Sequence, residues 1–429
     1  MDFTKSTISE LLSGKNVFLT GGAGVGKTTI TNEVIEHFEA EGKKVAKLAS
    51  TGMAATLIGG QTLHSFLDLG IASNIIELEQ RGKLNIAKKT KKLLANISLV
   101  VIDEISMVSA SLLEMIALRL KQADYRGVLL VVGDFLQLPP IARAYQKVEF
   151  AFQSESWSAF AFKKIELKHI YRTDDEKFIA LLGHVRFGRV DEAVHTQLNQ
   201  FIKPLPHDLS AFTFLFGKNS SAAAHNKMQL SFIESELFIR EVETIRHSQK
   251  VQDQEIERFL QDARIEKELA LKVGAPVLFT RNAWNYFNGE RGIVVNIDPN
   301  YVYVQKNDAR VIKLERVAQS KTNWVEKKIA GEVQLIEEAS FTLYQYPIKL
   351  AFAITIHKSQ GMSIEDLIIE TNEIFAPSQF YVALSRSCNP FRLILIAPSR
   401  QWYDLAYVDE RALRFVEGSW EASSQERED

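Results

Sequence analysis

A glycine-rich stretch at residues 21–28 constrains the fold of this chain more than any other feature. It reads Gly-Gly-Ala-Gly-Val-Gly-Lys-Thr, follows the apolar run Val17–Leu19 and precedes a stretch with apolar residues at helical spacing. Small residues let successive backbone N–H groups turn toward phosphate oxygens, and the positive end of the following helix adds to the attraction. A chance glycine-rich turn is the alternative, which the flanking strand and helix disfavour. The loop therefore predicts a strand–loop–helix unit that binds a nucleotide phosphate.

This phosphate loop also assigns roles to its side chains. We expect Lys27 to reach the β- and γ-phosphates of ATP and the Thr28 hydroxyl to coordinate Mg²⁺. The residues predicted to bind ATP at the loop are Gly22, Ala23, Gly24, Val25, Gly26, Lys27, Thr28 and Thr29.

Two acidic residues follow the apolar run Leu99–Ile102. If that run is the next strand of the sheet, Asp103 lies near Mg²⁺, directly or through water, and Glu104 can polarise the attacking water. An acidic pair after a strand is common by chance, so an ordinary strand end is the alternative. The adjacent pair favours an enzyme that hydrolyses ATP repeatedly over a protein that only holds a nucleotide.

A third element, Gly133 to Pro140, follows the apolar run Val128–Val132. Its Gln137 can hydrogen-bond both the γ-phosphate and a neighbouring domain, so it can report whether the phosphate is present. A proline-terminated turn is the alternative.

The order of apolar runs and helical stretches along the chain predicts two α/β domains. Continuous Val/Ile/Leu runs in the first third are typical of strands buried on both faces of a parallel sheet, and the stretches between them have helical spacing. Beyond about residue 165 come a charged helical region, β-like segments with turn signals, and a return of parallel-sheet texture. We therefore expect a first domain over 1–165 with a small insertion at about 67–92. The second domain covers 166–429, with a β-rich insertion at about 293–342.

Composition excludes several classes of protein. The chain of 429 residues is 46% hydrophobic and 24% charged, which argues against a disordered or fibrous protein. Its apolar runs fall short of the roughly 18 residues that span a bilayer, its first ten residues lack a secretory signal, and Cys388 is its single cysteine. We expect an intracellular protein without a membrane partner, cytoplasmic and nucleoid-associated if its host is bacterial.

Charge patterning limits how the chain could bind a polyanion. The net charge is −2, so contacts with nucleic acid would come from local grooves rather than from bulk charge. One basic cluster stands out, and a solvated helix face is its alternative interpretation. The cluster consists of Lys83, Lys88, Lys89, Lys91 and Lys92.

Further motifs carry a family resemblance. They lie at residues 49–55 (ASTGMAA), 60–66 (GQTLHSF), 104–108 (EISMV), 171–174 (YRTD), 354–362 (ITIHKSQGM) and 379–386 (QFYVALSR). In this order, and with the three elements above, the set resembles superfamily one DNA helicases of the RecD-like group. Within that group it is most similar to the petite-integration-frequency (Pif) helicases. The resemblance spans roughly residues 10–400.

The resemblance implies a fold class and an activity. The fold is α/β, with two RecA-like P-loop domains that have parallel sheets, a small insertion in the first domain and an SH3-like β insertion in the second. ATP would bind in the cleft between the domains, and single-stranded DNA would cross both. The implied activity is 5′-to-3′ translocation with unwinding of duplexes that carry a 5′ single-stranded tail, by a protein that we expect to be monomeric.

The resemblance also implies roles for residues outside the phosphate loop. Arg172 and Arg386 match two arginines that reach the γ-phosphate from the second domain, although a surface position is the alternative for Arg386. Gln360 and Gly361 match the link between the ATP cleft and the DNA track. Positions on or beside the DNA path are Thr51, Gly52, Thr62, His64, Phe66, Thr355, His357 and Lys358.

The candidates for base stacking are Phe66, Phe135 and His64, and a core position is the alternative for Phe66 and Phe135. The chain also departs from the family pattern. The family carries a glutamine upstream of the phosphate loop that reads adenine, whereas the first glutamine here is Gln61.

Two other functions stay open at this point. One is an ATP-gated clamp that binds single-stranded DNA and remodels protein–DNA complexes without unwinding. The other is a RecD-like subunit of a nuclease complex.

Overall fold

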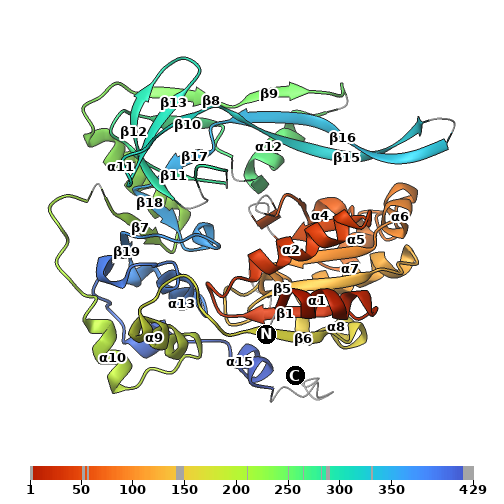
Figure 1. Cartoon of the computed structure of the whole chain (residues 1–429), viewed down its shortest axis with the longest axis horizontal. Coiled ribbons are helices and arrows are strands. Elements are labelled where there is room, and N and C mark those ends of the chain that lie inside the picture. Colours follow the sequence, from red (N-terminus) through yellow and green to blue (C-terminus); the bar gives the residue numbers. More distant parts are fainter. Residues whose placement is uncertain are drawn as a thin grey trace. The chain divides into compact units, whose positions relative to one another are not determined.

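The chain forms two compact units in a computed structural model (Figure 1). The described residues are 3–50, 54–55, 58–141, 149–209, 211–249, 251–263, 265–281, 283–286, 290–329 and 332–418. Unit 1 comprises residues 1–191, 376–381 and 406–429, and unit 2 comprises residues 192–375 and 382–405. Within the described ranges, none of the helices has the length and apolar character needed to cross a membrane.

Unit 1 is built on a six-stranded sheet in the order β3-β2-β4-β5-β1-β6, with every pairing parallel. The strands are β1 (Val17–Gly21), β2 (Val45–Ala49), β3 (Gln61–Thr62), β4 (Leu99–Asp103), β5 (Val128–Gly133) and β6 (Lys163–Leu167). The helices are α1 (Phe3–Leu12), α2 (Lys27–Ala40), α4 (Leu63–Phe66), α5 (Ile75–Gln80), α6 (Lys88–Ala95), α7 (Ala110–Gln122), α8 (Glu155–Phe160), α9 (Glu176–Arg186) and α15 (Glu410–Glu417).

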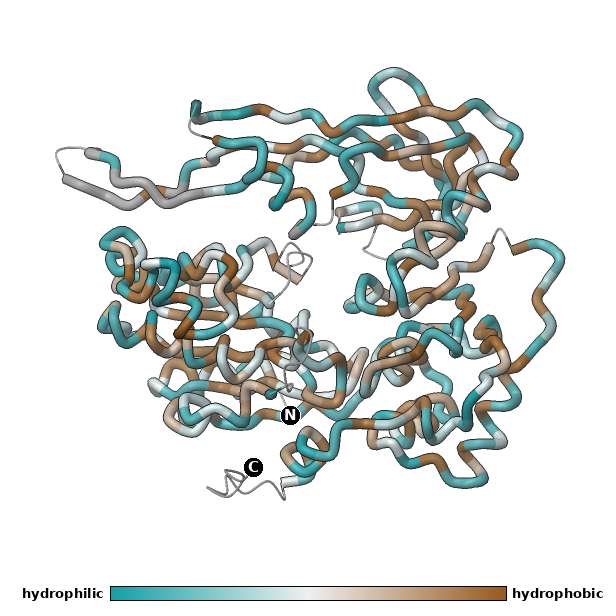
Figure 2. The backbone as a smooth tube through the Cα atoms, turned by 180° about the vertical axis from the view of Figure 1, so that it is seen from behind, coloured by the Kyte–Doolittle hydropathy of each residue, from teal (hydrophilic) through white to brown (hydrophobic). Residues whose placement is uncertain are grey.

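The central strands of this sheet are buried along their whole length. All residues of β1 and β5 are buried, which a parallel sheet covered on both faces requires. Their side chains pack with Val34 and Phe38 of α2 and with Leu11 of α1, and the apolar runs of the strands can be followed in Figure 2. Because all strands are parallel, the ends of β1, β4 and β5 meet at one edge of the sheet.

Unit 2 contains a smaller parallel sheet and three antiparallel sheets. The parallel sheet has the order β18-β7-β19-β20, and the antiparallel sheets have the orders β14-β13-β12-β11-β17, β15-β16-β9 and β10-β8. The parallel strands are β7 (Thr213–Phe216), β18 (Ala353–Thr355), β19 (Leu367–Ile369) and β20 (Leu393–Leu395).

The remaining elements lie between these parallel strands or beside them. The antiparallel strands are β8 (Phe238–Glu241), β9 (Glu243–Arg246), β10 (Glu268–Leu271), β11 (Pro276–Phe279), β12 (Arg291–Ile297), β13 (Val302–Lys306), β14 (Val311–Leu314), β15 (Val317–Ile329), β16 (Glu332–Gln345) and β17 (Ile348–Leu350). The helices are α10 (Glu192–Asn199), α11 (Asn219–Phe232), α12 (Asp253–Ala263) and α14 (Trp402–Leu405). Helix α13 (Gln379–Leu384) crosses from unit 1 into unit 2.

The compact units differ from the predicted domains. Unit 1 continues past residue 165 to residue 191 and includes residues 376–381 and 406–429 as well. Its C-terminal part belongs there because Phe415 of α15 packs among Phe18, Phe135 and Phe152, with ring centroids 4.2–6.4 Å apart. A domain boundary predicted from the order of apolar and charged stretches could not include these segments, because they follow unit 2 in the sequence.

The two insertions also differ in extent from the prediction. Segment 67–98 of unit 1 carries α5 and α6, outside the sheet. In unit 2 the antiparallel strands already begin at Phe238 and end at Leu350, a wider span than the predicted 293–342. The five-stranded sheet extends beyond both predicted bounds because β11, which precedes the predicted insertion, pairs with β17, which follows it.

Candidate nucleotide site

The phosphate loop lies between β1 and α2, as predicted, and two of its glycines are required by close contacts. A Cβ atom on Gly21 (φ 142°) would lie 2.3 Å from the carbonyl oxygen of Leu167. A Cβ atom on Gly24 (φ 75°) would lie 2.7 Å from Cβ of Arg172. Helix α2 begins at Lys27, so its free N–H groups and positive dipole end face the loop.

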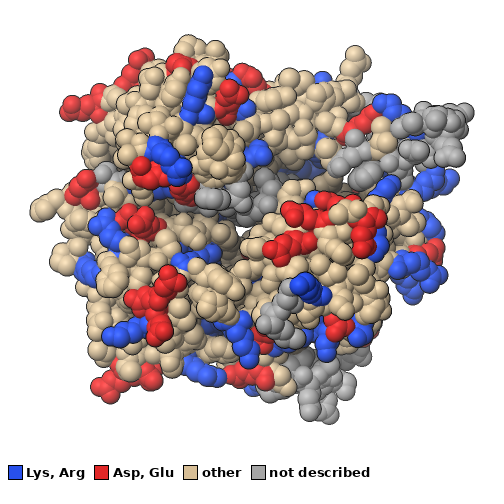
Figure 3. Space-filling model, viewed as in Figure 1, with Lys and Arg blue, Asp and Glu red and all other residues tan. Residues whose placement is uncertain are grey.

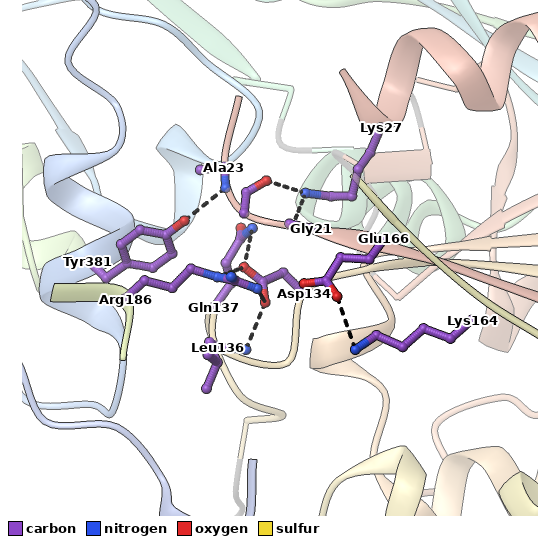
Figure 4. Close-up of polar contacts among 11 residues, drawn as sticks. Gly21, Ala23, Lys27, Asp134, Leu136, Gln137, Lys164, Glu166, Arg186 and Tyr381 are labelled. Carbon is purple, nitrogen blue, oxygen red and sulfur yellow. Dashed lines mark hydrogen bonds and ion pairs between the residues drawn. The ribbon is translucent and has the colours of Figure 1, made fainter. Parts of the chain in front are cut away.

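Lys27 lies among carboxylates at this edge of the sheet. Its Nζ donates to the carbonyl oxygens of Gly21 and Gly22, each at 2.8 Å (Figure 4). Burial lowers the pKa of Lys27, and this effect is opposed by the negative charges of Asp134, Glu104 and Asp103. The ammonium group is therefore placed where an anionic phosphate could replace loop carbonyls as its partner.

Asp103 and Glu104 lie at the end of β4, on the same edge of the sheet. Asp103 Oδ1 accepts a hydrogen bond from the backbone N–H of Glu104 at 2.8 Å. Burial raises the pKa of Asp103, although that hydrogen bond and Lys27 act in the opposite direction. Glu104 has a φ of 53°, in the left-handed region that glutamate seldom adopts. Such strain is typical of positions that the surrounding structure holds for function.

The segment after β5 places Gln137 beside a second buried carboxylate, Asp134. The backbone N–H of Gln137 donates to the carbonyl oxygen of Asp134 at 2.9 Å, and the N–H of Leu136 donates to Asp134 Oδ1 at 3.1 Å. The side chain of Gln137 makes only a long contact with Asp134 Oδ2, 3.5 Å from Nε2. Gln137 thus lies beside Asp134, whose charge acts on Lys27, and its predicted contact with the γ-phosphate stays a prediction.

Arg186 was not predicted for this site, yet it forms the strongest ion pair in it. Its Nε donates to Asp134 Oδ2 at 3.0 Å, and NH2 donates to Oδ1 at 2.9 Å. The Asp134 side chain is fully buried and that of Arg186 is 12% exposed. Burial acts to raise the pKa of Asp134, but Arg186 and Lys27 hold that pKa below its ordinary value. The sequence indicates only the acidic partner of this ion pair, because Asp134 follows Gly133 at the end of an apolar strand.

Two tyrosines to which the sequence analysis assigned no role also contact the phosphate loop. The Tyr381 hydroxyl accepts a hydrogen bond from the backbone N–H of Ala23 at 2.8 Å (Figure 4). The backbone N–H of Tyr171 donates to the carbonyl oxygen of Gly24 at 2.8 Å. The Tyr171 ring is largely exposed and lies 3.7 Å from the position of a Cβ atom on Gly26.

Arg172 lies in unit 1 with the phosphate loop, whereas the prediction assigned it to the second domain. Its Cβ packs against Gly24 because the chain after β6 runs back along the loop. This position is a correction to the predicted domain, and it brings Arg172 to the loop through unit 1 alone.

Arg386, by contrast, is held by main-chain groups of unit 2. Its guanidinium donates to the carbonyl oxygens of Val382 and Ser359, at 2.9 and 3.2 Å, and to Ser385 Oγ at 2.8 Å. The side chain is fully buried, so the alternative of a surface arginine is wrong. Its predicted approach to the γ-phosphate stays a prediction.

The other predicted residues of unit 2 gather around the end of β18. Thr355 is buried, and its Oγ1 accepts a hydrogen bond from the N–H of Lys358 at 3.3 Å. His357 and Lys358 are half-buried. Gln360 is buried with its Nε2 lacking a hydrogen-bond partner among the described residues, and Gly361 follows it with a φ of 76°.

The predicted DNA-binding residues of unit 1 have mixed outcomes. Thr62 accepts a hydrogen bond from the N–H of Ser65 at 3.3 Å, and His64 Nε2 lies 3.2 Å from the carbonyl oxygen of Ala72. Thr51 and Gly52 lie outside the described residues. Phe66 is buried beside the insertion, so its predicted stacking role is corrected to a core role.

Phe135 likewise belongs to the core. It contacts Phe18, Phe150, Phe152 and Trp157 at ring-centroid distances of 4.9–6.2 Å. Such rings stabilise the domain beneath the site and cannot accept a DNA base in this conformation.

A phosphate loop at the start of a helix, with acidic residues at the neighbouring strand ends of a parallel sheet, defines a P-loop nucleoside triphosphatase. Comparison with known proteins narrows this class. The family model for PIF1-like helicases matches residues 4–196. The ATP-dependent DNA helicase Pif1 of Campylobacter jejuni is 38% identical over 404 residues, which cover 89% of each chain. The chain therefore belongs to the Pif1 family of DNA helicases.

Solved structures agree with this assignment. A Bacteroides Pif1 structure in complex with ADP-AlF4 has a TM-score of 0.82 and 27% identity, covering 97% of this chain and 96% of that chain. Bacteroides Pif1 bound to single-stranded DNA has a TM-score of 0.65 and 28% identity, covering 98% and 96%. The predicted fold class, with RecA-like domains, and the predicted Pif-type helicase are thereby confirmed.

Proposed function

We propose that this chain couples ATP hydrolysis to 5′-to-3′ movement along single-stranded DNA and unwinds the duplex that it meets. The observation that carries the proposal is the cluster at one edge of the unit 1 sheet, where Lys27 lies among the carboxylates of Asp103, Glu104 and Asp134. Gathering four charged groups at one place costs free energy, because each of them is partly removed from water. A domain with a purely structural role has no need of such a cluster. A Mg·ATP complex would compensate both kinds of charge, with its cation near the carboxylates and its phosphates beside Lys27.

In this proposal, side chains of unit 1 bind and activate the nucleotide. Lys27 and the loop N–H groups bind the phosphates, and Glu104 orients the attacking water and accepts its proton. Arg172, packed on Gly24, stabilises negative charge at the γ-phosphate. The Thr28 hydroxyl and the Asp103 carboxylate would hold Mg²⁺; these two oxygen donors fit an ion that keeps waters and phosphate oxygens as its other ligands. Bound there, the ion would neutralise part of the phosphate charge.

Unit 2 completes the proposed motor through Arg386, Gln360 and the segment after β18. Arg386 donates to the carbonyl oxygen of Ser359, the residue immediately before Gln360, and this contact is the proposed link between the two side chains. Thr355, His357 and Lys358 precede them in the same segment and are proposed to bind DNA. Opening and closing of the two domains around ATP is the coupling step of this proposal. A structure of Bacteroides Pif1 bound to single-stranded DNA and a structure of Pif1 helicases that concerns unwinding at forked duplex DNA support the choice of substrate.

A directional unwinding assay tests the proposed function. We expect ATP-dependent strand separation of a duplex with a 5′ single-stranded tail and none with a 3′ tail, because 5′-to-3′ movement leads from a 5′ tail into the duplex and along a 3′ tail away from it. Fluorescence of a labelled displaced strand provides the measurement. Faster unwinding from the 3′ tail would overturn the direction. Hydrolysis without strand separation would instead indicate the ATP-gated clamp, and dependence on an added partner chain would indicate the RecD-like subunit.

Tyr171 is proposed to supply the base contact that the missing upstream glutamine would otherwise provide. Its exposed ring lies beside Gly26 of the phosphate loop and packs at a steep angle against the His169 ring, with centroids 4.5 Å apart. Stacking of a base on an aromatic ring contributes about 1–3 kcal/mol. Tyr171→Ala should therefore weaken ATP binding by about 10-fold, seen as a higher KM of DNA-stimulated hydrolysis.

Tyr171→Phe serves as the matched control, because it keeps the ring and should keep the parental KM. Since stacking does not distinguish purines, the alanine variant should lose affinity for ATP and GTP alike. An unchanged KM for both nucleotides in the alanine variant would remove Tyr171 from the base site.

A further inference from the structure

The helical insertion of unit 1 carries the densest positive charge of the chain. Residues 81–92 contain six basic residues and no acidic residue, in a protein whose net charge is −2. The basic residues are Arg81, Lys83, Lys88, Lys89, Lys91 and Lys92. In Figure 3, Lys and Arg side chains gather at the end of unit 1 where α6 is labelled in Figure 1.

Helix α6 separates these charges from its apolar face. Lys88, Lys89, Lys91 and Lys92 are exposed, whereas Thr90, Leu93 and Leu94 are buried. The four lysines share the outer face of a helix of two turns, and we call them the lysine face. Because the buried residues fix the rotation of the helix, the lysines are presented outward together.

Intramolecular ion pairs compensate little of the charge of Lys88, Lys89 and Lys91. Lys91 Nζ lies 3.2 Å from Asp124 Oδ2, but both side chains are at least half exposed, so the pair is weak. Among the described residues, Lys88 and Lys89 have no carboxylate within 4 Å. Four like charges on one short helix repel one another, which is unfavourable unless a polyanion compensates them.

The insertion is fastened to the sheet domain by the buried guanidinium of Arg119 on α7. Its Nε donates to the carbonyl oxygen of Leu67 at 3.0 Å, and NH1 and NH2 donate to those of Leu84 and Lys83 at 2.8 and 2.6 Å. Gln122 adds a second bond to Leu84 at 3.0 Å. Arg119 thus joins Leu67, at the start of the insertion, to Lys83 and Leu84, shortly before α6. These bonds hold α6, and with it the lysine face, against the sheet domain.

We propose that the lysine face of α6 is a contact surface for the phosphate backbone of duplex DNA. The proposal rests on the proposed helicase function, and it adds a second DNA surface in unit 1 to the predicted single-strand path. Phosphate contacts from lysines position a protein on a duplex without reading its sequence, which suits an enzyme that must move through any sequence.

Duplex DNA fits this surface better than a single strand does. Surfaces that bind single strands combine basic residues with aromatic side chains on which the bases stack. Residues 81–95 contain no Phe, Tyr, Trp or His. The lysine face can therefore bind phosphates but offers nothing to unstacked bases. A stiff backbone with closely spaced phosphates is the partner that matches it.

Binding measurements on the double variant Lys88→Gln/Lys89→Gln test the proposal. Affinities for a 5′-tailed duplex and for an oligothymidine are measured by fluorescence anisotropy across a salt series, without nucleotide. Each lost phosphate contact on a duplex lowers the slope of log K against log salt by about 0.9. We expect the slope for the tailed duplex to become shallower by about 1.8, and the slope for oligothymidine to stay unchanged.

Lys163→Gln/Lys164→Gln is the matched control, since it removes the same charge from two exposed lysines at the start of β6. It should leave both slopes at the parental values. An unchanged duplex slope for the Lys88/Lys89 variant would overturn the proposal, as would an equal change for oligothymidine or for the control variant. The assay does not depend on ATP hydrolysis. If the parent protein bound neither DNA, that result would count against the proposed helicase function and not against the lysine face alone.

Discussion

Replacing Lys27 with alanine is expected to abolish DNA-stimulated ATP hydrolysis and unwinding, with a loss of about 10³-fold or more in turnover. The expected size follows from the effect of single groups that stabilise phosphoryl-transfer charge, where one arginine contributes about 10³–10⁵. Lys27 is the cation nearest to the loop carbonyls, and the carboxylates of Asp103 and Glu104 face it. Without it, those carboxylates would repel the incoming phosphates.

The measurement is steady-state hydrolysis with saturating single-stranded DNA, followed by unwinding of the 5′-tailed duplex. Lys163→Ala controls for the loss of one exposed lysine and should retain parental rates. Circular dichroism of the Lys27 variant checks that the fold survives, since its side chain also bonds Gly21 and Gly22. Measurable unwinding by a folded Lys27→Ala protein would contradict the assignment of the phosphate loop.

The local half of this site could be predicted from the sequence, because its signals are local. A buried parallel strand requires a continuous apolar run, and a loop that wraps phosphate requires glycine at fixed spacing. Both patterns lie within a few residues of each other at β1 and at residues 21–28. Asp103, Glu104 and Gln137 follow from the same argument, since parallel strands end at one edge.

Contacts between distant parts of the chain could not be predicted in the same way. Arg186 is 52 residues from Asp134, and Tyr381 is 358 residues from Ala23. Neither residue stands in a pattern that specifies a partner, because pairing depends on how helices α9 and α13 return to the sheet. For the same reason the predicted domain boundary assigned Phe415 to the second domain, although it packs against rings of unit 1. This contact forms only when the C-terminal part of the chain packs back on unit 1.

Arg186→Met is expected to destabilise unit 1 by about 3–5 kcal/mol, the range found when one partner of a buried ion pair is removed. The Asp134 carboxylate would then stay fully buried, with Lys27, the Gln137 amide and backbone N–H groups as its remaining neighbours. Urea unfolding, followed by the fluorescence of Trp157 in the adjoining aromatic cluster, measures the loss. The double variant Asp134→Asn/Arg186→Met should lose less stability, since no buried charge is left.

The pH dependence separates a lost ion pair from lost packing. In the parent, the pKa of Asp134 lies below its ordinary value, so the pair stabilises the fold above the unfolded pKa and is lost as the pH falls through the folded pKa. In Arg186→Met the folded pKa should rise, and the folded state would then bind more protons than the unfolded chain. Stability of the variant should therefore fall as the pH rises above the unfolded pKa, and its deficit relative to the parent should be larger at neutral pH than in acid. A deficit that is the same in acid, below the folded pKa of Asp134 in the parent, as at neutral pH would mean that Arg186 supports the site by packing alone.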